Sequence, residues 1–385
     1  MDFFYTQEQK MLREAARKYS DERIAPAAAA IDREDRFPRE IYRGLAALGL
    51  FGVCLPEGAG GSGLGTQAAC IAMEEIARGS GAVGNMYAIP VEAALLLHEQ
   101  GSEAHKRWIP KLLDGSAISA TAVSEAHAGS DVADMRTVAL REGDDYVISG
   151  SKAWVTFGGI FDFIMVFAKT TREPGHHNIS AFLVEGDRPG IVRGKNEELM
   201  GMHGLEDCMV TFDHVRVPAS ARLGPENKAF KMAMANFNFS RLMMSSMALG
   251  MARAAYEDAY RYAKERSQFG QPIFEHQAVQ FMLADMSMDI AAARLLIHNA
   301  AQLFDAGQPI AKEAAHAKLF TTDMAMKHAS HALQIHGGAG YSRHHRVERI
   351  FRDVKLAQIY EGTNQIQRII IARQLDKELG RERAQ

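Results

Sequence analysis

The sequence predicts an α+β protein with a helical N-terminal domain (residues 1–118), a middle antiparallel β-sandwich or barrel domain (119–225) and a C-terminal helical domain of four-helix-bundle type (226–385). Apolar residues recur at helical spacing before about residue 118 and again after Pro225, whereas short alternating runs fill the stretch between them. A chain of 385 residues is also too long for one ordinary hydrophobic core. We therefore expect three domains in the order helical, β, helical.

The first domain begins with a predicted capping box of Thr6 and Gln9, in which the two residues satisfy each other's backbone N–H groups. Apolar residues follow on one helical face; they are Met11, Leu12, Ala15, Ala16 and Tyr19. Further helices are expected over residues 39–48, 66–78, 91–99 and 102–113.

The middle domain contains runs rich in Val, Ile, Phe and Thr that are separated by Gly, Asp and Pro. This spacing is typical of antiparallel strands and not of βαβ units. The predicted strands include residues 145–149, 163–167, 179–184 and 209–212.

The third domain returns to long helical periodicity. Helices are expected over residues 226–266, 275–306 and 309–335, with a shorter one at 345–355. Its methionines lie near helical spacing and are interpreted as adaptable core or pocket lining; they are Met243, Met244, Met247, Met251, Met282 and Met286.

Composition excludes several classes of protein. A net charge of −3 offers no basic surface for nucleic acid, and 47% hydrophobic with 24% charged residues describes a globular chain. Cys54, Cys70 and Cys208 are too few and too scattered for a disulfide framework or a zinc site. Residues 1–8 lack the pattern of a secretory signal, and no apolar run approaches the length of a spanning helix. We expect a reduced, cytoplasmic protein with no membrane span.

One stretch, residues 359–368, carries the strongest candidate for chemistry. Glu361 stands between the pair Ile359-Tyr360 and a Gly-Thr break, and Thr363 is a predicted N-cap for the helix that follows. Burial at such a corner would raise the pKa of Glu361 and make it a competent base near neutral pH. The alternative is a solvated Glu in a loop, and this stretch alone leaves it open.

Two other motifs are interpreted as decoys, the first for a dinucleotide site and the second for a metal site. The stretch Gly58–Gly63 matches G-x-G-x-x-G, but no βαβ unit surrounds it, so a flexible helix-helix loop is predicted instead of a dinucleotide site. His336, His344 and His345 lack a second pair of ligands on one face, and no metal site is predicted.

Three further stretches allow two interpretations each. The small-residue loop 123–131 could be an ordinary turn or could approach an anion or a ring edge. Trp154 on a predicted strand could be core, or could back a planar cofactor together with Thr156 on the same side of the strand. Arg266 at a helix end could bind phosphate or could be an exposed Arg that the helix dipole favours. The fifth stretch, 334–341, is a glycine-rich helix stop.

Taken together, these stretches resemble the acyl-CoA dehydrogenase family, the FAD-dependent enzymes that desaturate acyl-CoA thioesters at the α–β bond. The resemblance covers nearly the whole chain. Its most specific parts are Arg266–Phe269 with His276-Gln277, Gln334–Gly338, and Ile359–Arg373.

The resemblance implies that Glu361 is the catalytic base, which removes the α-proton while the β-hydride leaves for flavin N5. Some relatives place this base one residue before a conserved Arg on an earlier helix. The matching position here is Ser240, before Arg241, and Ser cannot act as that base. The base's own backbone N–H and a flavin ribityl hydroxyl would stabilise charge on the thioester oxygen.

The resemblance also implies a set of binding residues. Those expected to contact FAD are Val123, Ser124, Ser130, Trp154, Val155, Thr156, Thr363, Asn364 and Gln365, together with Arg266, Phe269, His276, Gln277, Gln334, Ile335, His336, Gly337 and Gly338 acting on the FAD of a neighbouring subunit. Those expected to contact the acyl-CoA are Ser130, Asn238, Arg241, Tyr360 and Gly362. Such two-sided sites imply a homo-oligomer, usually a tetramer, and an electron-transferring flavoprotein as partner.

The chain departs from the family pattern at several places. Ala126-His127 replaces a Pro-Gly pair in the loop beside flavin, and Phe157 stands where Asn is common. Asn238 and His203 occupy places where relatives often carry Asp and Arg. These departures bear on acyl specificity and on the grip on CoA, and they leave the FAD site intact.

Two alternatives to a dehydrogenase stay open. One keeps the fold but acts as an oxygen-using oxidase or a desulfinase-like enzyme, and the other is a non-catalytic acyl-CoA or FAD binding protein. The presence of Glu361 speaks against the second and mildly against a desulfinase. Acyl chain length and branching are not predicted; Met86, Tyr87 and Phe237 are candidate pocket liners.

Overall fold

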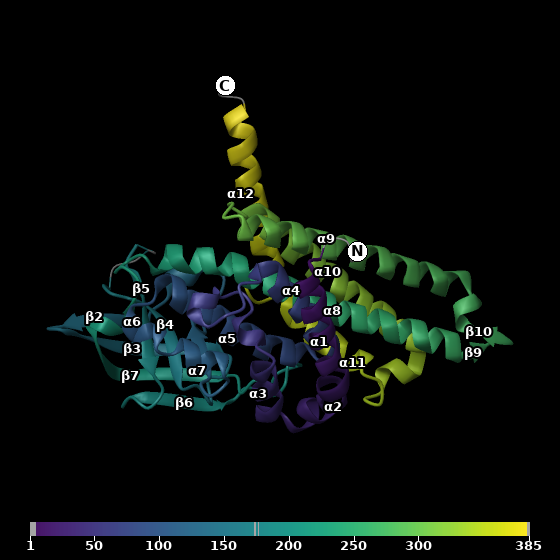
Figure 1. Ribbon diagram of the computed structural model, residues 1–385, viewed down its shortest axis with the longest axis horizontal. Helices are drawn as coiled ribbons and strands as arrows, with labels where there is room; N and C mark the ends of the chain where they lie inside the picture. Colours follow the sequence, from purple (N-terminus) through teal and green to yellow (C-terminus); the bar gives the residue numbers. More distant parts are fainter. Residues whose placement is uncertain (1–4, 173–174, 176, 383–385) are drawn as a thin grey trace.

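The computed structural model describes residues 5–172, 175 and 177–382. Its body is elongated, with a β-sheet at one end and long helices at the other, and the last helix projects away from that body (Figure 1). The predicted organisation into helical, β and helical parts is confirmed.

The N-terminal helices pack around a hydrophobic interior. They are α1 (Gln7–Tyr19), a π-helical turn (Ser20–Ile24), α2 (Ala25–Glu34), α3 (Arg39–Ala47), α4 (Gly65–Gly79), α5 (Gly81–Gln100), α6 (Glu103–Lys106) and α7 (Ile109–Leu113). The predicted capping box is present at α1, where the Thr6 hydroxyl accepts from the Gln9 N–H and the Gln9 side chain accepts from the Thr6 N–H. Residues 58–63 form part of the loop that leads into α4.

Two helices differ from the prediction for local reasons. Helix α5 begins at Gly81, ten residues before the expected start, because the Ser80 hydroxyl caps it by accepting from the Val83 N–H. The helix expected over 102–113 is instead two short helices, α6 and α7. Pro110 in an uninterrupted helix would clash with the carbonyl of Lys106, and α6 ends at Lys106.

The middle domain is built on one eight-stranded sheet with the path β6-β7-β3-β2-β4-β5-β8. Its strands are β1 (Ser119–Ala122), β2 (Val138–Glu142), β3 (Asp145–Val155), β4 (Phe163–Lys169), β5 (Ile179–Glu185), β6 (Ile191–Asn196), β7 (Cys208–Pro218) and β8 (Arg222–Leu223). Most neighbours are antiparallel as expected. Strand β1 differs, because it pairs with β4 in parallel, and β2 meets β4 in parallel at a single residue pair.

The C-terminal helices follow the predicted spans closely. They are α8 (Ala229–Glu265), α9 (Gln277–Asp305), α10 (Ala311–His336), α11 (Val347–Ala357) and α12 (Asn364–Glu382), with a small hairpin of β9 (Ser267–Gln268) and β10 (Gln271–Pro272) between α8 and α9. The start of α8 packs on the sheet, where Ala229 and Phe230 lie in one hydrophobic cluster with Ile179 and Leu183 of β5. Farther along, α8 packs against α4, α9 and α10.

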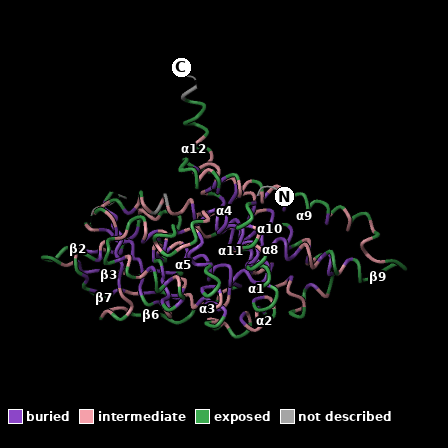
Figure 2. The backbone as a smooth tube through the Cα atoms, viewed as in Figure 1, coloured by how far each residue is buried: buried purple, intermediate pink, exposed green. Residues whose placement is uncertain are grey.

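Helix α8 therefore connects the sheet to the helical end of the molecule. The methionines predicted as core or lining are buried at Met243, Met244, Met247 and Met251, and Met286 of α9 is buried as well. Figure 2 shows this buried interior running through α4, α8, α10 and α11, with exposed surface along α9 and α12.

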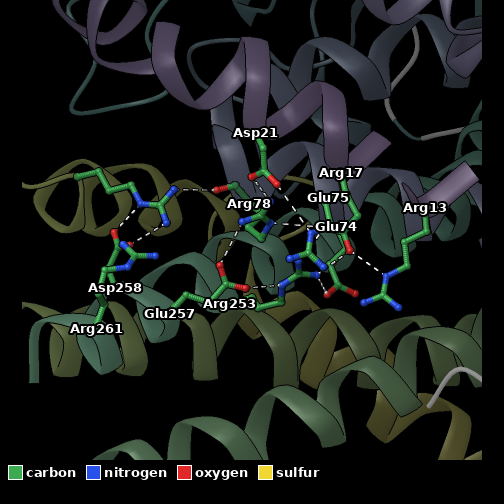
Figure 3. Close-up of polar contacts among 11 residues, drawn as sticks. Arg13, Arg17, Asp21, Glu74, Glu75, Arg78, Arg253, Glu257, Asp258 and Arg261 are labelled. Atoms are coloured by element: carbon green, nitrogen blue, oxygen red, sulfur yellow. Dashed lines mark hydrogen bonds and ion pairs between the residues drawn. The ribbon is translucent and has the colours of Figure 1, made fainter. Parts of the chain in front are cut away.

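A buried network of ion pairs joins the two helical domains (Figure 3). Arg253 of α8 donates to Glu74 of α4 at 2.6 Å and to Glu75 at 2.7 Å. Arg294 of α9 also binds Glu74, and Arg13 of α1 binds Glu75 at 3.0 Å. Burial opposes ionisation of Glu74, but the charges of Arg294 and Arg253 outweigh it and lower its pKa to about 2.

Across the described ranges, no helix combines the length and the apolar character needed to cross a membrane.

Candidate active site

Glu361 lies in the corner between α11 and α12, as the capping signal predicts. The backbone turns sharply there, because Glu361 has a φ of 53° and Gly362 a φ of 82°. Left-handed backbone costs a residue with a side chain roughly 1 kcal/mol, so the surroundings must hold this turn in place. The Thr363 hydroxyl accepts from the Ile366 N–H at 3.3 Å and caps α12.

The carboxyl of Glu361 is poised between opposing influences. Burial, the larger influence, raises its pKa, while the cations of Arg241 and Lys318 lower it. Its Oε2 atom is buried and has no hydrogen-bond partner among the described residues. A carboxyl with a raised pKa and a free oxygen can accept a proton from a bound ligand.

A second carboxyl, Glu92 of α5, lies close enough for its charge to interact with that of Glu361. Glu92 accepts a hydrogen bond from the Ser240 hydroxyl at 2.7 Å. Burial, and then the charge of Glu361, raise the pKa of Glu92 to about 8. Two carboxylates in one dry site cannot both ionise cheaply, so Glu92 stays protonated at neutral pH while Glu361 keeps its cationic neighbours.

Three of the residues predicted to hold the acyl-CoA, Arg241, Tyr360 and Gly362, lie at or near this corner. Arg241 lies within electrostatic range of Glu361 and donates to the Asn238 side-chain oxygen at 2.8 Å. Its Nε atom is buried without a partner in the described part of the chain. Tyr360 packs beside Met247, with its hydroxyl 3.6 Å from the sulfur.

Trp154 is not a core residue. Of the two interpretations open for it, core packing is excluded and a role beside a planar cofactor remains. Trp154 is 61% exposed and has a φ of 58°. The β3–β7 register shifts between Lys152 and Val155, so strand alternation no longer decides which side chains share a face. The assumption that Trp154 and Thr156 share one side of a regular strand is therefore wrong.

Thr156 is nonetheless tied to the Glu361 corner. Its hydroxyl donates to Asp207 at 2.8 Å, and burial raises the pKa of Asp207 to about 6. Burial and the charges of Glu361, Glu92 and Asp207 together raise the pKa of Tyr360. Thr156, through Asp207, thus belongs to the same electrostatic neighbourhood as the candidate base.

The loop 123–131 is anchored from below by a buried ion pair. Lys152 of β3 donates to the Glu125 carboxylate and to the Val123 carbonyl, both at 2.9 Å. Burial lowers the pKa of Lys152 to about 8, against the attraction of Glu125. The Ser124 backbone carbonyl accepts a hydrogen bond from the Ala153 N–H at 3.0 Å, while Ser130 is exposed. The loop is held firmly, with its tip open to a ligand.

A second group of predicted residues lies at the far end of the molecule. Arg266 and Phe269 stand at the β9–β10 hairpin, which Figure 1 places opposite the sheet, and Phe269 is 96% exposed. The stretch 334–338 ends α10 nearby, because the His336 ring stacks on Tyr262 of α8 at 4.3 Å. A single chain therefore does not bring this group to Trp154.

The remaining predicted residues fall into the same two places. Val155 is buried, and Asn364 is buried at the start of α12, where Gln365 is exposed. His276 and Gln277 follow the hairpin, and the His276 ring meets the Phe269 ring edge-on at 5.9 Å. His203, which stands where relatives often carry Arg, connects distant parts of the backbone. Its ring nitrogens lie 2.7 Å from the Asp32 carbonyl and 2.9 Å from the Leu199 carbonyl.

These features fit a flavin nucleotide and an acyl thioester. The exposed indole of Trp154 offers a flat apolar face, and Glu361 Oε2 and Arg241 Nε are buried polar atoms that a ligand could satisfy. At the other end, a side-chain carbon added at Gly270, Gly337 or Gly338 would meet nothing within 4 Å, which leaves open backbone for close approach.

Sequence reasoning missed Lys318, Glu92 and the Glu125–Lys152 pair. Each carries a detectable signal. Lys318 lies on the face of α10 that is otherwise lined by small buried residues such as Ala314 and Thr322. Glu92 is the single formally charged residue of the long apolar stretch 81–97. Their partners, however, come from distant segments and cannot be read from local spacing.

In the part of the chain that the structure describes, no three His, Cys, Asp or Glu side chains come together in a metal-binding cluster.

Comparison with known proteins gives matches along the entire chain. Family models described as the acyl-CoA dehydrogenase N-terminal, middle and C-terminal domains match residues 6–116, 120–215 and 227–375. An acyl-CoA dehydrogenase of Bacillus subtilis (strain 168) is 41% identical over 372 residues, which cover 96% of this chain and 98% of that protein.

Two solved structures have the same fold. Butyryl-CoA dehydrogenase from Megasphaera elsdenii superposes with a TM-score of 0.94 at 37% identity, over 97% of this chain and all (100%) of that one. A chain in a structure of the electron transferring flavoprotein of Acidaminococcus fermentans gives 0.95 at 37% identity, over 97% of this chain and 99% of that one.

Proposed function

Because this chain belongs to the acyl-CoA dehydrogenase family, we propose that it oxidises the Cα–Cβ bond of an acyl-CoA thioester with Glu361 as the base. It is an FAD-dependent oxidoreductase of that family. One observation carries the assignment of the base: Glu361 is half-buried with a buried, unpartnered Oε2 atom, and two nearby cations favour its ionised form.

The proposed reaction requires a base for the α-proton and hydrogen-bond donors to the thioester oxygen. A C–H bond next to a thioester carbonyl is weakly acidic, so a carboxylate in water would not remove its proton. Burial strengthens Glu361 as a base, and the proton passes to its Oε2 atom. The Glu361 backbone N–H is proposed as a donor to the thioester oxygen, where each aimed donor is worth about 3 kcal/mol.

Bound FAD would supply the acceptor for the hydride from the β-carbon, while Glu361 takes the proton from the α-carbon, so the two C–H bonds would give one hydride and one proton. We assign Trp154, Thr156 and the loop 123–131 to the flavin, supported by the exposed indole and by the anchored loop. Asn238, Arg241, Tyr360 and Gly362 are assigned to the acyl-CoA, since they surround Glu361.

We further propose that the active protein is a homotetramer. Arg266, Phe269 and residues 334–338 lie at or near the β9–β10 hairpin, which Figure 1 places opposite the sheet whose strand β3 carries Trp154, so they would act on the FAD of a neighbouring subunit. Helix α9 supports this, because Phe281, Met288 and Leu295 recur every seventh residue on it and are 59%, 63% and 50% exposed. A stripe of that kind is suited to helix packing between subunits.

An electron-transferring flavoprotein is the proposed acceptor of the electrons. The proposal is supported by the structure from Acidaminococcus fermentans, in which a chain of this fold occurs under that protein's name.

The test uses purified protein carrying FAD, mixed without oxygen with a panel of straight, branched and aryl acyl-CoA thioesters. We expect at least one thioester to bleach the flavin absorbance within seconds. If none of the panel bleaches the flavin, the proposed activity is refuted. Rapid re-oxidation by air with product still bound would identify an oxidase in place of a dehydrogenase.

A further inference from the structure

A buried lysine, Lys318 of α10, lies directly beneath the turn that carries the proposed base. Its side chain is fully buried. The Nζ atom donates to the Gly362 carbonyl at 2.9 Å and to the Asn364 side-chain oxygen at 2.8 Å. A charged side chain is rarely buried unless it is paired or fully hydrogen-bonded, and here both of its acceptors belong to the Glu361 corner.

The turn that Lys318 contacts is strained and needs such support. Glu361 and Gly362 both have left-handed backbone. The Gln367 side chain donates to the Glu361 carbonyl at 3.2 Å and to the Gly362 carbonyl at 2.8 Å. Lys318 and Gln367 thus share the Gly362 carbonyl from two sides, and together they fix where the Glu361 side chain leaves the backbone.

Lys318 also acts through its charge. Burial lowers the pKa of Lys318 to about 8, while the carboxylate of Glu361 attracts its proton. The charged groups around Glu361 are Arg241 from α8, Lys318 from α10 and Glu92 from α5, with Tyr360 next to it in the chain. Lys318 itself faces Arg241 and Asp323 in addition to Glu361. Without Lys318, Arg241 alone would oppose the burial of Glu361 and the neighbouring Glu92.

We propose that Lys318 is a positioning residue for Glu361, which fixes the turn at residues 361–362 and keeps the carboxyl in its ionised, proton-accepting form. The inference rests on the proposed role of Glu361. It assigns a role in the reaction to a side chain that need not touch the substrate.

The experiment measures the rate of anaerobic flavin reduction by one reactive acyl-CoA between pH 5 and pH 9. Three variants of the FAD-loaded protein are compared with the wild type. Lys318→Met removes the charge and both donated bonds, Lys318→Arg keeps the charge, and Lys327→Met removes an exposed lysine of the same helix, one that pairs with Asp289 at 3.3 Å.

The acidic limb is the part of the pH–rate profile where the rate falls as Glu361 is protonated. A nearby opposite charge lowers a carboxyl pKa by about one unit, so losing the Lys318 cation in Lys318→Met should move this limb to higher pH by about that amount. The limb should stay in place in Lys318→Arg, even if its rate falls, and in Lys327→Met. If Lys318→Met fails to fold, Lys318→Gln is measured in its place, since it keeps donors but loses the charge.

The inference is overturned if the limb stays at the wild-type pH in the uncharged variant, whatever happens to the rate. It is equally overturned if Lys318→Arg moves the limb as far as Lys318→Met does. Glu361→Gln is measured in parallel. Reduction at the wild-type rate in that variant would refute Glu361 as the base, on which this inference rests. An inactive Glu361→Gln with an unmoved Lys318→Met limb would refute only the role of Lys318.

Discussion

The chemistry proposed for this protein depends on single ionisable side chains whose charge is set by their neighbours. Glu361 and Glu92 lie in one buried region, yet their surroundings favour different charge states. Arg241 and Lys318 favour the ionised form of Glu361 alone. Opposed environments for two nearby carboxyls are a frequent mark of acid–base sites.

Glu92 gives a direct test of this electrostatic account. Its pKa is about 8 in the folded protein and 4.5 ordinarily, so the folded state binds more protons than the unfolded state between these values. The wild-type free energy of unfolding should therefore lose a contribution as pH rises from 4.5 to 8. Glu92→Gln should stabilise the protein at pH 8 more than at pH 5, as measured by urea unfolding.

Ser240→Ala serves as the matched control, since it removes the hydrogen bond to Glu92 but leaves the carboxyl in place. An equal change in the free energy of unfolding at both pH values for Glu92→Gln would show that Glu92 does not titrate in this range.

The corner at Glu361 could be predicted from sequence because its signals are local. The Gly-Thr break and the capping by Thr363 lie within a few residues of the base. The roles of Lys318 and Glu92 could not be predicted, because they depend on contacts between α5, α10 and the corner that only the folded chain creates. Periodicity cannot tell whether Trp154 packs in the core or faces a cofactor, and its exposure follows from a register shift that only the folded sheet shows.

Helices are held together by charges as well as by apolar packing. Arg253 connects α8 to α4, and Glu74 and Glu75 are buried so deeply that removing Arg253 would leave them poorly compensated. Arg253→Met should lower the free energy of unfolding by about 3–5 kcal/mol, the range for breaking a buried pair.

Denaturant unfolding of Arg253→Met beside Arg216→Met checks this prediction. Arg216 is exposed and pairs with Glu142 on the surface, so its loss should leave the unfolding midpoint nearly unchanged. Similar destabilisation by the two substitutions would contradict the structural role of the buried network.

Most helices and strands were predictable, since apolar periodicity extends through α8, α9 and α10. The prediction omitted the first ten residues of α5 for a physical reason. Gly81 and Gly84 weaken helical propensity there, and only the Ser80 cap marks where the helix begins. The parallel pairing of β1 with β4 could not be predicted, because strand direction depends on where the chain re-enters the sheet.

At the scale of the whole molecule, the residues proposed to bind FAD lie at two distant ends. Under the proposal, the group at the β9–β10 hairpin and the group at the end of β3 would serve one FAD only where two subunits meet, because Figure 1 places the hairpin opposite the sheet. Met288→Glu would place a charge in the exposed apolar stripe of α9. We expect this variant to sediment as a smaller species than the wild type and to lose FAD during gel filtration.

Met11→Glu is the control, because Met11 of α1 is equally exposed at 62% but lies outside that stripe. A Met288→Glu variant with wild-type size and full FAD content would rule out α9 as the subunit interface.

The account as a whole depends on one side chain, and one measurement tests it most directly. Glu361→Gln keeps the size of Glu361 and one of its acceptor oxygens, but it replaces the other oxygen with an NH2 group and cannot accept the α-proton. With the most reactive acyl-CoA of the panel, the rate constant for anaerobic flavin reduction should fall at least about a hundredfold, while FAD content stays at the wild-type level. Reduction of the flavin at the wild-type rate in Glu361→Gln would contradict the assignment of Glu361 as the base.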